Sequence, residues 1–107
     1  MIEVTQLDKN AFKFSLKTSD GNILMHSVPY RSREQLNGVV AELQALASNH
    51  MAFERQTNHQ GKFLFQLRGT DGKIIGKSQL YNSEAGMENG IKNLKNRIAT
   101  LRYTDLS

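Results

Sequence analysis

Apolar and polar residues alternate in two stretches of the chain that resemble each other. In residues 12–17 and 63–68, Phe or Leu occupies every second position. A period of two predicts a strand with one buried face. An Asp-Gly pair follows each stretch, and a second alternating stretch begins at Ile23 or Ile74. Asp-Gly between alternating segments predicts a β-hairpin with a two-residue turn, in which both turn residues have a positive φ.

A two-residue turn also sets the register of the first hairpin. Thr18 then lies opposite Ile23 and Leu16 lies opposite Met25, so that the apolar side chains share one face. The Phe side chains of both hairpins belong to this same face. We therefore expect helices to cover them, rather than finding them exposed as a platform on which RNA bases stack.

Apolar residues recur at helical spacing after each hairpin. Ser32 and Ser83 precede the two stretches and are predicted N-caps, and Gln35 completes a capping box in the first. The apolar stripes are Leu36, Val39, Val40, Leu43, Leu46 and Ala47 in the first stretch and Met87, Ile91, Leu94 and Ile98 in the second. Further strands are predicted before the hairpins, at residues 2–6 and 53–57.

These elements belong to a longer internal repeat. Residues 12–32 and 63–83 are identical at nine of 21 positions with an offset of 51, whereas chance gives about one or two matches. Strands clustered before each helix predict an α+β fold, in which two βββα units form one mainly antiparallel sheet with both helices on one face. We expect a single domain at 1–107, with repeat one at about 1–51, repeat two at about 52–101 and a final strand at about 102–106.

The repeated motif is Phe-x-Phe-x-Leu, Asp-Gly, Ile, Ser, Tyr-x-Ser and Asn-Gly-Ile. It resembles the YegP-like family of small tandem-repeat bacterial proteins, best over residues 53–94. The first repeat departs from the motif, because one residue fewer separates Tyr30 from Asn37 than separates Tyr81 from Asn89. The resemblance implies two βββαβ units that exchange their C-terminal strands. It implies no activity and no catalytic residue, because the family is functionally uncharacterised.

Composition narrows the class of protein. The 107 residues include no Cys, which excludes a disulfide framework, a thiolate metal site and a cysteine nucleophile. No apolar stretch is long enough to cross a membrane, and residues 1–20 lack the pattern of a secretory signal. We therefore expect a cytoplasmic location.

The sequence contains no recognisable arrangement of catalytic residues. His26, His50 and His59 lack the spacing of metal ligands. Ser27 and Ser78 recur in the repeat without a nucleophile elbow, and we expect them where the sheet passes close to a helix. The sequence therefore predicts a protein that is not an enzyme and that binds no metal or cofactor.

The positive charge belongs to one half of the chain. Residues 1–51 carry five basic and five acidic residues, whereas residues 52–107 carry nine basic and five acidic residues, a net charge of +4. Alternation places four basic residues outward in the second half, with Leu64 and Ile75 among them. These candidate contacts for an anion or nucleic acid are Lys62, Arg68, Lys73 and Lys77. The alternative is that outward positions are polar only because they face water and deter edge pairing.

A third group of repeated polar residues lies outside the turns: Tyr30, Tyr81, Asn37 and Asn89. One interpretation is a small-ligand site beside the helices, which the backbone of the Asn-Gly pairs would approach. The other is structural, because a Tyr at such a junction usually buries its ring and Gly permits close packing of a helix.

We take a small non-enzymatic binding or assembly module as the leading hypothesis. Assembly would take the form of a homodimer through the open sheet face or an edge strand. The first alternative is weak, sequence-independent binding of nucleic acid or an acidic protein by the basic sheet face. The second is a small-ligand-binding domain at the repeated Tyr and Asn positions.

Overall fold

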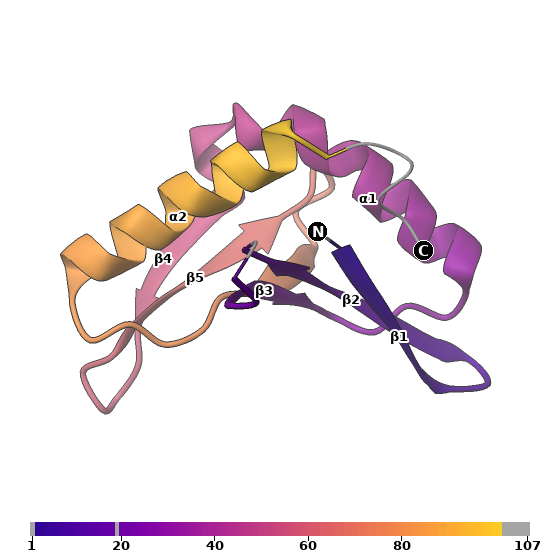
Figure 1. Ribbon diagram of the computed structural model, residues 1–107, viewed down its shortest axis with the longest axis horizontal. Helices are drawn as coiled ribbons and strands as arrows, with labels where there is room; N and C mark the ends of the chain where they lie inside the picture. Colours follow the sequence, from indigo (N-terminus) through magenta and orange to yellow (C-terminus); the bar gives the residue numbers. More distant parts are fainter. Residues whose placement is uncertain (1, 19, 102–107) are drawn as a thin grey trace.

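The computed structural model describes residues 2–18 and 20–101 (Figure 1). The chain forms the strands and helices in the order β1 (Ile2–Asp8), β2 (Ala11–Lys17), β3 (Ile23–Ser27), α1 (Arg33–Ala47), η1 (His50–Ala52), β4 (Phe53–Thr57), β5 (Phe63–Arg68), β6 (Ile74–Lys77) and α2 (Glu84–Ala99). The strand predicted at 2–6 is two residues longer than expected. The predicted final strand at 102–106 and its exchange lie outside the described residues.

All six strands form one sheet in the order β1-β2-β3-β6-β5-β4, with every neighbouring pair antiparallel. The two halves of the chain meet at β3 and β6, where His26 pairs with Lys77 and Ser27 pairs with Gly76. Both helices lie on one side of this sheet (Figure 1). The predicted α+β class with an antiparallel sheet is therefore confirmed.

The turn of the first hairpin differs from the prediction. Thr18 N donates a hydrogen bond to Asn22 O at 2.8 Å, and Gly21 N donates to Thr18 O at 3.1 Å. The loop therefore has three residues, and Gly21, with a φ of 91°, takes the left-handed conformation while Asp20 does not. A loop with a left-handed glycine at Gly21 needs no positive φ at Asp20, where the Cβ would make it costly.

This longer loop shifts the register near the turn. Leu16 lies opposite Met25 as predicted, but Lys17 rather than Thr18 lies opposite Ile23. The second hairpin has the same irregularity, and there Ile75 is only 4% exposed. The expectation that Ile75 lies on the outward face is therefore wrong, because the irregular register turns its side chain into the core.

Both predicted N-caps are confirmed. Ser32 Oγ accepts a hydrogen bond from Gln35 N at 3.1 Å, and Ser83 Oγ accepts one from Gly86 N at 3.0 Å. The Gln35 side chain accepts a hydrogen bond from Arg31 N rather than from the N-cap itself. These bonds satisfy amides that have no partner inside the helix.

The helices bury their apolar stripes against the sheet. The buried helical residues are Leu36, Val40, Leu43 and Leu46 in α1 and Met87, Gly90, Ile91, Leu94 and Ile98 in α2. They join the strand residues in one hydrophobic cluster, in which Phe14 and Phe65 are fully buried. The phenylalanines thus lie on the helix side, as the alternation predicts.

The repeated serines complete the hydrogen bonding of the sheet. Ser27 Oγ accepts a hydrogen bond from the buried Phe14 N at 2.8 Å and donates to Val28 O at 2.9 Å. Ser78 Oγ accepts the corresponding bond from Phe65 N at 3.0 Å. A buried amide without a partner is costly, so these hydroxyls have a structural role where each strand leaves the ladder.

Each helix is tied to the hairpin of the other half. Glu42 of α1 accepts hydrogen bonds at 2.9 Å from both the backbone amide and the hydroxyl of Thr70, in the β5–β6 turn. Arg97 of α2 donates through Nε to Lys17 O, at the end of β2, at 3.0 Å. The two halves therefore share contacts well beyond the β3–β6 pair.

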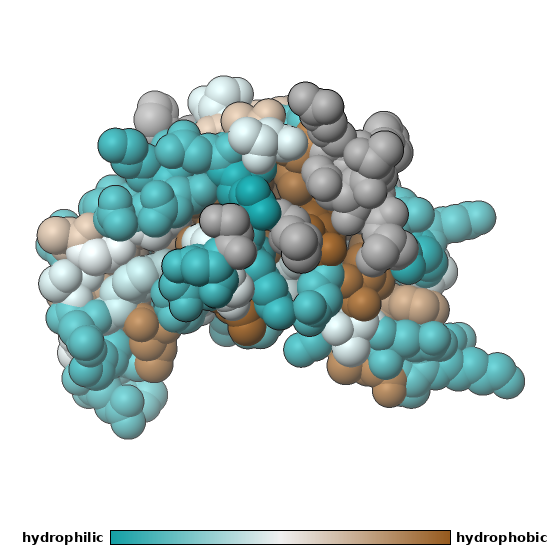
Figure 2. Space-filling view, viewed as in Figure 1, coloured by the Kyte–Doolittle hydropathy of each residue, from teal (hydrophilic) through white to brown (hydrophobic). Residues whose placement is uncertain are grey.

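The sheet face without helices is concave. The β1–β2 and β4–β5 loops bend away from the helices at the two ends of the molecule (Figure 1). In the space-filling view a hollow lies between two hydrophilic ends (Figure 2). We call this concave side the open face.

Candidate binding face of the sheet

A row of polar residues crosses the middle of the open face. Each member pairs directly with the next across all six strands, so the side chains are neighbours on one face. The row, from β1 to β4, consists of Glu3, Ser15, His26, Lys77, Gln66 and Glu54. We call it the central row.

Two members of the central row are buried although no helix covers them. Ser15 is 7% exposed and Gln66 is 5% exposed. Ser15 Oγ lies 3.1 Å from His26 Nδ1, so the hydroxyl and the ring share a hydrogen bond. Gln66 Oε1, in contrast, has no hydrogen-bond partner among the described residues. Burying such an acceptor is costly unless a donor reaches it.

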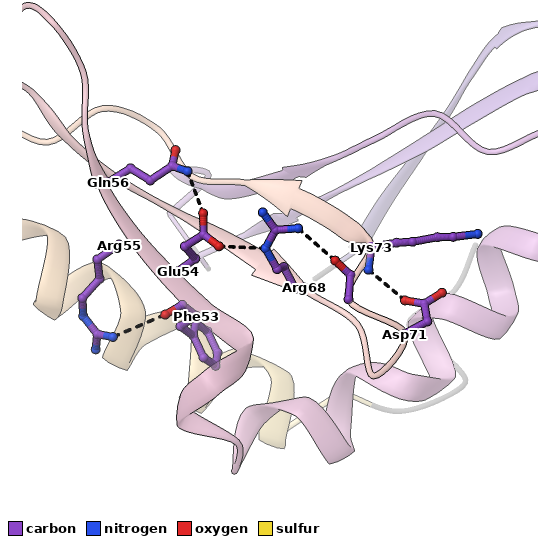
Figure 3. A network of polar contacts seen from close by, with 8 residues as sticks. Phe53, Glu54, Arg55, Gln56, Arg68, Asp71 and Lys73 are labelled. Atoms are coloured by element: carbon purple, nitrogen blue, oxygen red, sulfur yellow. Dashed lines mark hydrogen bonds and ion pairs between the residues drawn. The ribbon is translucent and has the colours of Figure 1, made fainter.

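A chain of polar contacts surrounds Glu54 at the β4 end of the row (Figure 3). Its carboxylate accepts hydrogen bonds from Arg68 Nε at 2.8 Å and Gln56 Nε2 at 2.8 Å. These donors, first Arg68 and then Gln56, lower the pKa of Glu54 below its ordinary value of 4.5. Arg55 belongs to the other side of the strand, where it pairs with Glu88 of α2.

The opposite end of the row has a matching ion pair. Lys17 Nζ lies 3.0 Å from Glu3 Oε2. Lys17 and Glu3 precede Arg68 and Glu54 by 51 positions each, so the same pairing occurs in both halves. Two of the basic residues on this face are therefore neutralised locally.

The four predicted anion contacts do not form one cluster. Lys77 lies in the central row and is exposed, whereas Arg68 is engaged by Glu54 and by Gly72 O. Lys73 lies exposed in the β5–β6 turn. Lys62 lies at the other end of β5, where its Nζ contacts the side-chain oxygen of Asn82. Six residues of extended strand separate Lys62 from Arg68 by roughly 20 Å.

The repeated tyrosines stack on the core phenylalanines. Tyr30 lies 6.4 Å from Phe14 between ring centroids, and Tyr81 lies 6.5 Å from Phe65. Burial, followed by the charges of two nearby carboxylates, raises the pKa of Tyr30 to about 12. The tyrosines thus have the packing role that a junction position favours.

The second Asn-Gly pair has a clear packing role. A Cβ atom at Gly90 would lie 2.2 Å from the Tyr81 hydroxyl, and the absence of a side chain there lets the ring pass beneath α2. At Gly38 an added Cβ would meet no atom within 4 Å. Asn37 accepts a hydrogen bond from Arg33 Nε at 3.2 Å, and Asn89 is exposed.

Two grooves lie outside the open face. One, of about 520 Å³, runs between the β2–β3 turn and α2 and is lined by Thr18, Asp20, Leu24, Asn93, Asn96, Arg97 and Thr100. The other, of about 220 Å³, is lined by Arg55, Gln56, Thr57, Phe63, Glu84 and Met87. Neither groove has a repeated Tyr or Asn in its lining, so the small-ligand hypothesis stays a prediction.

Across residues 2–18 and 20–101, no three His, Asp or Glu side chains come together as metal ligands. Neither of the two long helices in that part has the length and apolar character needed to cross a bilayer.

Most of the central row escaped prediction from the sequence. Alternation shows that Ser15, His26 and Gln66 point outward, but not that they adjoin Lys77. Their juxtaposition depends on the β3–β6 pairing, which joins residues far apart in the chain. A search for outward polar residues in both hairpins, rather than for basic ones alone, would have included them.

The family and the relatives named below carry no assigned activity in their names. The family model described as "Domain of unknown function (DUF1508)" matches residues 58–102. A UPF0339 protein of Acinetobacter baylyi is 30% identical over 105 residues, which cover 98% of this chain and 95% of the relative. The UPF0339 protein YegP of Escherichia coli K12 is 30% identical over 93 residues, which cover 87% and 84%.

A solved structure shows the same architecture. The solution NMR structure of YegP from E. coli, described as a protein of unknown function, matches with a TM-score of 0.85 and 28% identity, covering 92% of this chain and 85% of that one. The sequence similarity and the shared fold agree with the family that the repeated motif indicates. The chain belongs to the UPF0339 family, whose members include YegP.

Proposed function

We propose that this protein is a non-enzymatic binding module, and that its open face binds an anionic partner. The observation that carries the proposal is the central row, in which the buried amide oxygen of Gln66 has no partner among the described residues, on a face that neither helix covers. A face that only meets water has no need of buried polar side chains. A binding surface does, because such groups orient a ligand.

The charge of the open face favours an anion. Its strands carry Lys13, Lys17, Arg68 and Lys77 against Glu3 and Glu54, four positive charges against two negative ones, or +2. The two ion pairs neutralise Lys17 and Arg68. Lys13 and Lys77 therefore provide the excess charge, and they also draw an anionic partner toward the face.

Binding is a better account of this face than catalysis. Ser15 and His26 resemble a nucleophile and its base, but Ser15 is buried and no carboxylate pairs with the ring among the described hydrogen bonds. A catalytic serine needs a base that a third group orients, and it must reach the substrate. We infer that the pair positions the other ring nitrogen, Nε2, toward a ligand.

NMR titration at 50 mM salt tests the proposal. Isotope-labelled protein is mixed in turn with double-stranded DNA, single-stranded DNA and poly-glutamate. We expect amide shifts in β2, β3, β5 and β6, and shifts smaller by several fold in α1 and α2. If none of the three polymers binds, or if the shifts map to the helices, the proposal is wrong.

Self-association through the open face is the competing proposal. Two copies facing each other would bring together like charges from Lys13 and Lys77, which disfavours that dimer. We therefore expect sedimentation as a 12.1 kDa monomer at micromolar concentration. A dimer at that concentration would contradict this expectation. The variant K13Q/K77Q tests the reason given for it, because removal of the like charges should favour the dimer.

We also propose that the two halves are copies of one unit. The recurrence of the Lys17–Glu3 pair as Arg68–Glu54 supports this, as do the equivalent bonds of the repeated serines. A copied unit explains why both halves present the same face. It also explains why, from each edge of the sheet inward, the first, second and third strands of one half follow in sequence order.

A further inference from the structure

In the part of the chain that the structure describes, the open face lacks Phe and Tyr side chains, and the aromatic ring exposed there is that of His26. All seven Phe and Tyr residues of residues 2–18 and 20–101 belong to the core cluster or pack against it: Phe12, Phe14, Tyr30, Phe53, Phe63, Phe65 and Tyr81. Proteins that bind single-stranded nucleic acid on an open sheet stack the bases on exposed aromatic rings. The His26 ring alone gives the open face a much smaller stacking surface than the several aromatic rings that such proteins use.

Basic residues instead lie at both ends and in the middle of the open face. Lys9 is exposed in the β1–β2 loop, and Lys62 adjoins the β4–β5 loop. Lys13 and Lys77 lie between them on β2 and β6. Five inter-strand spacings of about 4.8 Å make the sheet roughly 24 Å wide. That is wider than the major groove of DNA, about 12 Å, so the face can reach phosphates on both sides of a groove.

The symmetry of the sheet also matches a double helix. From each edge inward, the three strands of one half follow in sequence order, and β3 and β6 meet as an antiparallel pair. An approximate two-fold axis therefore lies between β3 and β6. Duplex DNA has local two-fold axes, and proteins with two related halves align with them. A flexible acidic peptide has no such symmetry.

Hydrogen-bonding groups lie where a groove would meet the face. His26, bonded to Ser15 through Nδ1, is exposed on the face, and Gln66 Oε1 lies buried in the neighbouring part of the row without a hydrogen-bond partner among the described residues. The edges of base pairs in a groove present both donors and acceptors, whereas a carboxylate presents only acceptors.

We propose that the anionic partner of the open face is double-stranded DNA, contacted along both backbones. This inference rests on the proposed function above, and it adds the identity of the partner. Contacts from Lys9, Lys13, Lys62 and Lys77 neutralise about four phosphates, for which the slope of log K against log salt is about −3.6. Most of the affinity then comes from phosphate, with little dependence on base sequence.

Fluorescence anisotropy distinguishes the candidate partners. The probes are a labelled 20-base-pair DNA duplex, one of its strands alone, and a poly-glutamate peptide of comparable charge, each at several salt concentrations. We expect the duplex to bind at least tenfold more tightly than either other probe at 50 mM salt. Because the poly-glutamate peptide is comparable in charge to the duplex, the comparison of these two probes separates a duplex site from simple attraction of charge.

Two variants of equal charge locate the site. K13Q/K77Q removes two charges from the open face and should lower duplex affinity at least tenfold, with the salt slope reduced by about 1.8. R31Q/K92Q removes two exposed charges elsewhere, before α1 and on α2, and should change duplex affinity less than threefold. Circular dichroism and urea unfolding confirm that both variants are folded.

The possible results separate this inference from the proposed function. If single-stranded DNA or poly-glutamate binds as tightly as the duplex and K13Q/K77Q loses that binding, the duplex inference is overturned while the anionic face stands. If R31Q/K92Q loses as much affinity as K13Q/K77Q, or if no probe binds at 50 mM salt, both are overturned.

Discussion

Replacing the two glycines of the Asn-Gly pairs by alanine should have opposite effects on stability. Both glycines lie within helices, where alanine is favoured by about 1 kcal/mol. A Cβ at Gly38 meets no atom within 4 Å, so Gly38→Ala should raise the free energy of unfolding by about 0.4–1 kcal/mol. At Gly90 the same gain competes with a steric clash.

The clash at Gly90 involves a ring that has little room to move. An added Cβ would lie 2.2 Å from Tyr81 Oη and 2.6 Å from Cζ. The Tyr81 backbone is held by two hydrogen bonds to Phe63, and its ring stacks on Phe65. Overpacking of this kind costs about 1–3 kcal/mol or more. After the gain in helix propensity, we expect Gly90→Ala to lower the free energy of unfolding by about 1–2 kcal/mol.

Urea unfolding of both variants, and of both in a Tyr81→Leu background, measures these effects. Leucine lacks the two atoms nearest to the added Cβ, so Gly90→Ala in that background should become neutral or stabilising, a coupling of about 1–3 kcal/mol. Gly38→Ala should have the same effect in both backgrounds. If Gly90→Ala stabilises the protein that contains Tyr81, or if the coupling is absent, the packing explanation of the second Asn-Gly pair is refuted.

Three further outcomes are expected. Ser27→Ala leaves a buried amide without a partner and should lower the free energy of unfolding by about 1–3 kcal/mol, measured by urea unfolding. Ser48→Ala on the surface should lower it by less than about 0.5 kcal/mol. Equal losses would contradict the role of Ser27. The pKa of Glu54 in the folded protein lies below its ordinary value of 4.5, so the stability that its ionised form contributes is lost as the pH falls from 4.5 through the folded pKa. In acid titrations, Glu54→Gln should therefore lose less stability than the unchanged protein. An identical profile would count against the ion pair. The pKa of Tyr30 in the folded protein is raised to about 12, so ultraviolet titration should show one tyrosine that ionises well above pH 10, and this signal should be absent from Tyr30→Phe. The stability that the neutral hydroxyl contributes is lost as the pH rises from 10 to about 12. Ionisation of Tyr30 at its ordinary pKa would show that the ring is not buried.

Local patterns predicted the elements of this fold well because local interactions decide them. The period of two in residues 12–17 and 63–68 and the caps at Ser32 and Ser83 each depend on neighbours within a few residues. The turn was less predictable. Asp-Gly suits both a two-residue and a three-residue loop, and the longer loop places Ile75 in the core rather than on the surface.

The candidate site depends on contacts that no local pattern encodes. Outward positions such as His26 and Lys77 are visible in the alternation, but their pairing requires the two halves to meet at β3 and β6. Gln66 is buried beside Glu54 and Lys77, which the pairing of β5 with both of its neighbouring strands brings to it. Charge alone selected Arg68, which the structure shows to be engaged by Glu54.

The strand order β1-β2-β3-β6-β5-β4 is one that two separate polypeptides could build by pairing edge to edge. Here residues 48–52 join the two parts, so the partners always meet in a ratio of one to one. Two identical subunits would have to carry the same charge. A joined pair is free of that constraint, and this chain uses the freedom, with a neutral first part and a second part at +4. The covalent link thus lets the two parts differ in total charge while the open face keeps a net charge of +1 in each part, from Lys13, Lys17 and Glu3 in one and from Arg68, Lys77 and Glu54 in the other.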